Sequence, residues 1–224
     1  MPLSYNAIAG QSTARLANLS DSIFGVAMTL LILEVRLPVD GISTERQLWY
    51  ALIALGPRFL VYFMSFLTLG IFWNAQQAQL TRLARSDRNL TWIHIAFLAT
   101  VAVTPFSTAL EENFIHLRVA LLLFCVNLML LGFTLYVSWR YAYAYDLLRA
   151  EVSSDEVYAI KHRLVLGQVL YVVGFALCVF STLWSIAAIV LVQLVFALAP
   201  TIPWLKRQQA LARGDTRGDR SGAA

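Results

Sequence analysis

The chain has 224 residues, of which 59% are hydrophobic and only 13% charged, and its formal net charge is +4. An ordinary soluble domain is nearer a quarter charged, so this composition excludes a soluble fold. A membrane-spanning helix needs roughly 20 mostly apolar residues, and the length therefore leaves room for about six such helices with short loops. We expect an all-α integral membrane protein.

The apolar runs and the polar segments between them predict six transmembrane helices, over residues 16–37, 47–73, 90–110, 117–139, 164–183 and 185–204. The fifth and sixth are separated only by the segment around Thr182 to Ser185, which predicts a tight helical hairpin. Between the other spans lie polar stretches at 82–88 and 151–156, and Ser153 or Ser154 is a candidate helix cap in the second of them.

These spans predict three segments. Residues 1–14 form a cytoplasmic N-terminus, residues 15–205 form the six-helix membrane domain, and residues 206–224 form a basic tail. The tail is rich in Gly, Ala, Arg, Asp and Ser without periodicity, which is the composition of a disordered segment.

The distribution of cations predicts the orientation, because Lys and Arg in short flanking loops are retained on the cytoplasmic side. With a cytoplasmic N-terminus, thirteen of the seventeen Lys and Arg residues fall on that side. Only Arg36, Arg46 and Arg118 fall on the other side, and Arg58 lies within the second predicted span. We therefore predict that both termini are cytoplasmic. The same asymmetry explains the basic balance, so we expect lipid and not nucleic acid as the partner.

The first predicted span departs from the rules for a lipid-facing helix. Asp21 and Glu34 bracket an uncharged stretch of only twelve residues, 22–33. At 1.5 Å per residue this stretch is roughly 18 Å long, well short of the ~30 Å hydrocarbon core. Ionisable groups at such depth usually face a bundle interior or an aqueous path. The alternative is a tilted helix whose two carboxylates reach the headgroups.

Within this stretch one helical stripe stands out. Its members fall at i, i+4, i+7, i+8 and i+11, and they are Ser22, Val26, Thr29, Leu30 and Leu33. The stripe is a candidate lining for a cavity, but Val and Leu at helical spacing are also typical of packing residues. Periodicity leaves both interpretations open.

Other polar residues have two interpretations each. The polar residues after Trp73 (Asn74, Gln76 and Gln77) are either an interfacial helix end or a polar latch onto the first span. Glu111, Glu112 and His116 are expected in a solvated loop on the outer side, where they could also attract cations.

The sequence shows no motif for enzyme chemistry and no metal-binding pattern. It lacks a Walker A sequence, a G-x-S-x-G elbow, an H-E-x-x-H pair and a T-V-G-Y-G loop. His94, within the third predicted span, is expected to be a neutral, hydrogen-bonded histidine. Cys125 and Cys178 lie in apolar runs and are read as small core residues. We expect neither an enzyme nor a bound cofactor.

The segment from Arg15 to Val35 resembles the first helix of the transmembrane protein 175 family of potassium channels, which carries an Arg, then Phe-Ser-Asp, then an apolar run with a Thr. Here the run contains Ser20-Asp21 and Thr29, with Leu19 where the family usually has Phe. The later landmarks follow in the family's order: Pro57, Tyr62, Ser65, Phe66, Trp73, Asn89, Pro105, Phe106 and Thr108. Gln76 stands where the family often has a histidine.

The resemblance implies a homotetramer in which the first helix of each subunit surrounds a central pore that conducts K⁺. It implies narrow layers at Val26, Leu30 and Leu33, with the Thr29 hydroxyl near the same level. Such apolar rings gate by dewetting, because they do not replace the hydration shell of an ion. Glu34, near the outer mouth, would raise the local cation concentration.

The resemblance also implies a polar latch that holds the pore helix to its neighbours: Arg15, Ser20, Asp21, Trp73 and Gln76. The single repeat is similar to bacterial members of the family, so we expect a cell-membrane protein. Three functional classes are weighed. A passive cation channel is favoured, a secondary transporter would use Asp21 and Glu34 as coupling carboxylates, and a membrane scaffold would use the stripe of the first span only as an oligomer contact.

Overall fold

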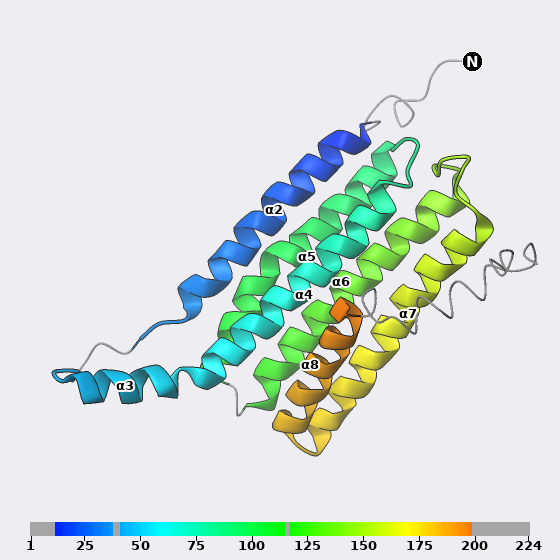
Figure 1. Cartoon of the computed structure of the whole chain (residues 1–224). Coiled ribbons are helices and arrows are strands. Elements are labelled where there is room, and N and C mark those ends of the chain that lie inside the picture. The colour runs from blue at the N-terminus through cyan, green and yellow to red at the C-terminus, as the bar shows by residue number, and fades with distance from the viewer. Residues whose placement is uncertain (1–11, 38–40, 115–116, 199–224) are drawn as a thin grey trace, which may run out of the picture.

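The computed structural model describes residues 12–37, 41–114 and 117–198. Within them the chain forms seven α-helices and one short 3-10 turn, η1 (Leu177–Val179). The helices are α2 (Thr13–Glu34), α3 (Glu45–Ala54), α4 (Gly56–Leu80), α5 (Arg88–Asn113), α6 (Arg118–Ala144), α7 (Ser154–Ala176) and α8 (Thr182–Leu198). The long helices run side by side in one bundle, while α3 projects from one end of it (Figure 1). The predicted all-α fold is confirmed.

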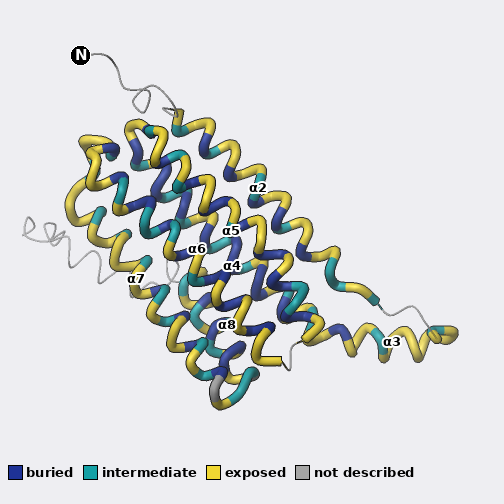
Figure 2. The backbone as a smooth tube through the Cα atoms, turned by 180° about the vertical axis from the view of Figure 1, so that it is seen from behind, coloured by how far each residue is buried: buried dark blue, intermediate teal, exposed yellow. Residues whose placement is uncertain are grey.

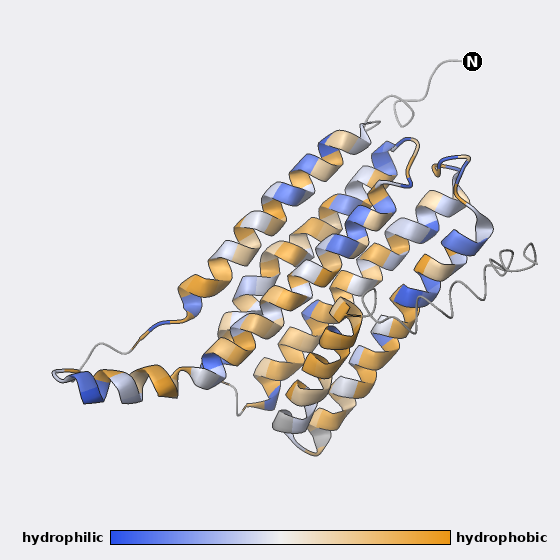
Figure 3. Cartoon of the chain, in the orientation of Figure 1, coloured by the Kyte–Doolittle hydropathy of each residue, from blue (hydrophilic) through white to orange (hydrophobic). Residues whose placement is uncertain are grey.

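Five of these helices are long and apolar enough to cross a membrane: α2, α4, α5, α6 and α7. Their apolar residues fill the middle of the bundle, and hydrophilic residues gather toward the ends (Figure 3). The apolar part of α8, Trp184–Leu198, is shorter than a full span. Because the sixth predicted span, 185–204, runs past Leu198 and out of the described residues, six spans per chain stays a prediction.

The prediction of one continuous helix over 47–73 is wrong. The chain forms two helices here, which meet at Leu55, and α4 continues to Leu80. Pro57 explains the break, because proline has no backbone N–H and cannot bond to the carbonyl four residues earlier, in α3. It is tolerated here because it lies in the first turn of α4. Hydropathy alone does not predict the break, since both helices are apolar.

The bounds of the fifth span are also wrong. The fifth long helix begins at Ser154, not at 164, and ends at Ala176. Ser153 is its N-cap and accepts a hydrogen bond of 3.2 Å from the Glu156 N–H. The first turns are polar, so they extend the helix beyond the apolar run from which the span was predicted. The turn into α8 lies at Phe180 and Ser181, slightly earlier than expected.

Two loops come together at one end of the bundle. The loop after α4 meets the loop after α6, where the Ala84 N–H donates to the Leu147 carbonyl and the Arg149 N–H to the Arg82 carbonyl, both at 2.9 Å. Arg85 and Arg88 lie in the first of these loops or just after it. We call this end of the bundle, defined by Arg82, Arg85, Arg88 and Arg149, the basic end.

The packing order places α2 on one side of the subunit. It contacts α4 and α5, whereas α7 contacts α6 and α8 on the other side (Figures 1 and 2). The main core lies between these layers and includes Phe24, Phe97 and Phe124, all essentially fully buried. This arrangement leaves one full face of α2 without a partner inside the subunit.

Candidate functional site

One face of α2 packs against the subunit. Its buried residues recur every three or four positions, namely Leu16, Ser20, Phe24, Ala27 and Leu31. The ring of Phe24 meets that of Phe97 on α5, with centroids 6.0 Å apart. This face fixes which residues of α2 point the other way.

The opposite face of α2 is apolar and exposed. Val26 is 58% exposed, Leu30 43% and Leu33 62%, and Thr29 lies exposed among them. The subunit therefore does not use this stripe in its own core, contrary to the simple packing interpretation. An apolar stripe of this kind needs a cover, which in a membrane is lipid or another protein chain.

Thr29 supplies the polar atom at this level. Its hydroxyl donates within α2, lying 3.0 Å from the Gly25 carbonyl and 2.9 Å from the Val26 carbonyl. A hydroxyl that donates inward still has acceptor lone pairs. The exposed stripe thus combines apolar side chains with one oxygen able to face a cation or water. Glu34, half-buried at the last turn of α2, ends the stripe.

Near the basic end, α2 is joined to α4 by side-chain hydrogen bonds. The Gln76 amide nitrogen donates to the Ser20 hydroxyl at 2.9 Å, and both side chains are fully buried. One carboxylate oxygen of Asp21 accepts from Trp73 Nε1 and from Gln77 Nε2, each at 2.8 Å. Two adjacent residues of α2 therefore hold three side chains of α4.

The structure brings together Ser20, Asp21, Trp73 and Gln76, four of the five residues assigned to the latch by resemblance. Arg15 does not join them: its backbone N–H donates to the Ser12 hydroxyl at 3.3 Å, and its side chain has no carboxylate within 4.0 Å among the described residues. Gln77 also joins them; the sequence made it a candidate latch residue, although the set implied by the resemblance omitted it. Its position one helical turn after Trp73 was the signal, since residues i and i+4 share a helix face.

At the other end of the bundle Arg58 ties three segments together. Its Nη1 donates to the Arg36 carbonyl, just after α2, at 3.0 Å, and its Nε lies 3.8 Å from a Glu112 carboxylate oxygen on α5. The expected solvated loop is wrong for Glu111 and Glu112, because both lie buried in the last turn of α5. Neither oxygen of Glu111 has a hydrogen-bond partner. His116 lies outside the described residues.

The hydrogen bond expected of His94 is confirmed. The side chain is buried, and its Nδ1 lies 3.1 Å from the Leu90 carbonyl in its own helix. Among the described residues, no group of three or more His, Cys, Asp or Glu side chains is placed to hold a metal ion.

Comparison with known proteins places this arrangement in a family. Residues 15–105, from α2 into α5, match the family model described as endosomal/lysosomal potassium channel TMEM175. A potassium channel of Chamaesiphon minutus is 30% identical over 83% of this chain and 94% of its own length. The chain belongs to the TMEM175 family. A potassium channel of Streptomyces collinus is also 30% identical, over 79% of this chain and 87% of its own length.

The fold agrees with a solved member of the family. The crystal structure of a lysosomal potassium-selective channel TMEM175 homolog from Chamaesiphon minutus matches 84% of this chain and 97% of its own, with a TM-score of 0.74 and 28% identity. The human endosomal/lysosomal proton channel TMEM175 is 26% identical over 96% of this chain, which spans only 42% of the human protein. Family membership identifies a membrane protein of an ion-channel family, not of an enzyme family.

Proposed function

We propose that this chain is one subunit of a homotetrameric potassium channel, in which α2 of four copies surrounds a central pore. The observation that carries the proposal is the exposed stripe of Val26, Leu30 and Leu33 on a helix whose other face is firmly packed. A stripe of this kind can close on itself around an axis, because cyclic assembly buries the same surface of every copy.

The permeation mechanism follows from the side chains on the stripe. Val26, Leu30 and Leu33 form successive apolar rings, which conduct only when they are wide enough to hold water. Thr29 places a ring of hydroxyl oxygens between them, with their hydrogens turned toward the helix backbone. Glu34 of four copies surrounds the outer mouth and raises the cation concentration there.

Potassium is the proposed permeant ion because two relatives matched over most of their length are named potassium channels. Protons are a second candidate, favoured by the proton-channel name of the human relative. A coupled transporter that uses Asp21 is disfavoured, because one Asp21 oxygen already holds two side chains of α4. We place the channel in the cell membrane with both termini cytoplasmic, supported by the cations at the basic end.

The test is ion flux from purified protein in liposomes, measured separately for K⁺, Na⁺ and H⁺. Passive K⁺ flux is expected without a coupled ion, and flux of H⁺ but not K⁺ would assign the channel to protons. Val26→Asn and Leu33→Asn should raise K⁺ flux and lower discrimination against Na⁺, because a polar ring keeps water in the constriction.

Val172→Asn is the matched control, since Val172 is 50% exposed on α7, away from α2. Its flux should equal that of the unmodified protein. The pore assignment fails if both α2 variants behave like this control. A monomer or dimer in mild detergent, measured by light scattering, would contradict the tetramer.

A further inference from the structure

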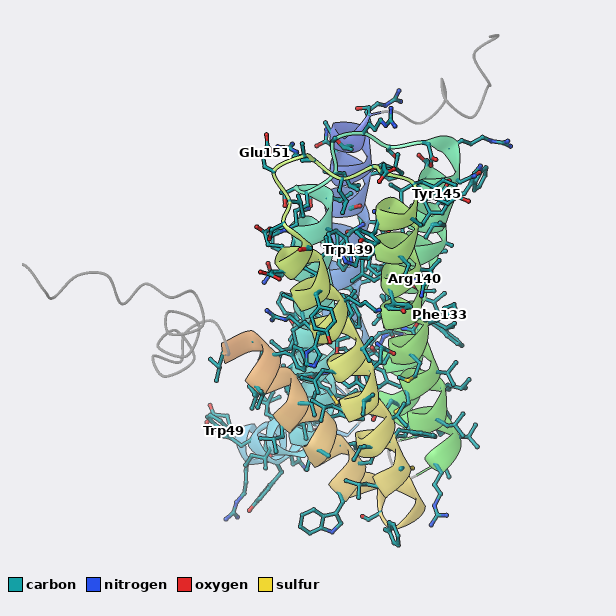
Figure 4. The ribbon with its side chains drawn as sticks, turned by 90° about the vertical axis from the view of Figure 1, so that its right-hand side faces the viewer. Trp49, Phe133, Trp139, Arg140, Tyr145 and Glu151 are labelled. Carbon is teal, nitrogen blue, oxygen red and sulfur yellow. The ribbon has the colours of Figure 1, made fainter. Side chains whose placement is uncertain are left out.

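A cavity of about 660 Å³ opens between α4, α7 and the end of α8. Its walls are mostly apolar and include Ile71, Ala75, Leu164 and Phe196. In Figure 4 the described part of α8 lies beside the lower part of α7, which continues to the basic end. The volume lies within the range of small-molecule sites in proteins.

Two arginines line the cavity on the side of the basic end. Arg82 is paired with Glu156 at 3.0 Å and also donates to the Ala78 carbonyl at 2.7 Å. Arg163 has no carboxylate within 4.0 Å among the described residues. Its Nη2 donates to the Phe196 carbonyl at 3.1 Å, and its guanidinium carbon lies 5.5 Å from the centre of the Phe196 ring. Since a guanidinium has five N–H donors, Arg163 keeps donors for an anion.

Two buried polar atoms also lack partners in this wall. Gln79 and Tyr171 both line the cavity and are more than nine-tenths buried. The Gln79 amide nitrogen donates to the Leu135 carbonyl at 3.3 Å, but its oxygen has no partner, nor does the Tyr171 hydroxyl. Both atoms are themselves buried, so they lie behind the surface of the cavity wall.

We propose that this cavity binds one anionic glycerophospholipid from the leaflet at the basic end. Its phosphate lies against Arg163, which binds phosphate well because its planar fork is weakly hydrated. One acyl chain follows the apolar wall of Ile71, Ala75 and Leu164. Basic pockets between transmembrane helices on the cytoplasmic side are known to hold anionic headgroups.

The position of the cavity favours lipid over a second copy of the chain. It lies between α4 and α7, and α4 separates it from α2 (Figure 1). If α2 faces the pore, as in the proposed function, the side with the cavity faces the bilayer. The lipid site itself needs only the membrane, so it can be tested without measuring ion flux.

The first measurement is native mass spectrometry of the full-length protein after delipidation and exposure to equal amounts of phosphatidylglycerol and phosphatidylcholine. Phosphatidylglycerol should be retained preferentially, at one molecule per chain. No preference in the unmodified protein overturns the proposal, and would mean that another part of the chain or a second copy fills the cavity. Failure of the channel proposal, by contrast, would appear in the flux assay or in the oligomeric state, and not in lipid retention.

The second measurement is the rise in unfolding temperature when phosphatidylglycerol replaces phosphatidylcholine in the micelle. Arg163→Gln should weaken phosphatidylglycerol binding about tenfold, the effect of losing one charge-assisted hydrogen bond. Arg163→Lys should restore part of it. Arg140→Gln is the matched control: Arg140 is exposed near the basic end and does not line the cavity (Figure 4).

If phosphatidylglycerol raises the unfolding temperature of Arg163→Gln and Arg140→Gln equally, the assignment of Arg163 is overturned. Ala75→Trp tests the apolar part of the site, because it fills the cavity and leaves both arginines in place. It should lower phosphatidylglycerol retention in the mass spectrum, and unchanged retention would place the lipid elsewhere.

Discussion

Ser20 and Gln76 are joined by one hydrogen bond. Replacing one residue or the other by an apolar side chain should nevertheless change the free energy of unfolding differently. Ser20→Ala leaves the fully buried Gln76 amide with neither of its ends paired, because the amide oxygen already lacks a partner. An unpaired buried group costs about 1–3 kcal/mol, and interhelical bonds in membranes average about 0.6 kcal/mol. We expect Ser20→Ala to lower the free energy of unfolding by about 1 kcal/mol.

Gln76→Leu should leave stability unchanged or raise it. Leucine removes the unpaired oxygen, while the Ser20 hydroxyl keeps its 2.8 Å bond to the Leu16 carbonyl. The free energy of unfolding is measured by titrating SDS into mixed micelles while following tryptophan fluorescence. The double variant completes the cycle, and Ser20→Ala should cost less when residue 76 is Leu. A larger loss for Gln76→Leu than for Ser20→Ala would refute this reasoning.

Two further predictions use the same stability assay. Arg58→Gln leaves the Glu112 carboxylate, whose side chain is 1% exposed, without its cation. It should lower the free energy of unfolding by about 1–2 kcal/mol, a value reduced because Arg58 is 35% exposed. Arg58→Lys keeps the charge and should cost less, so equal losses would argue against the ion pair. Gly174→Val should cost about 1–3 kcal/mol by overpacking, because even a Cβ here would lie 3.3 Å from Ile189 Cγ1. Gly70→Ala is its control, since the nearest atom there is 4.0 Å away, and equal effects would count against tight α7–α8 packing.

Hydropathy predicted the membrane class and most of the long helices, because each span carries its own apolar signal. It failed where a local backbone effect decides the structure. Pro57 separates α3 from α4 inside one apolar run, and the polar first turns of α7 lie outside the run that predicted it. Both errors arise from the same limit, since mean hydropathy reports solvent preference and not backbone geometry.

The candidate site was predictable in part. Helical spacing placed Val26, Thr29 and Leu33 on one stripe of α2 but left open whether that stripe is exposed. The bonds of Ser20 and Asp21 to α4 followed from a family resemblance. The contact of Arg58 with Glu112 did not, because the two residues lie far apart in sequence and Glu112 borders a polar segment. The cavity lined by Arg163 could not be predicted either, since it depends on how α4, α7 and α8 pack together.

The two attachments of α2 to α4 have a mechanical consequence. Side-chain hydrogen bonds hold α2 at Ser20 and Asp21, and Arg58 holds the backbone at Arg36. Between these points the packed face contributes apolar contacts, such as that of Phe24, which have no preferred direction. A rod restrained at both ends bends most easily in the middle. The centre of this stretch carries Thr29, so the proposed constriction lies where the least force is needed to change its width.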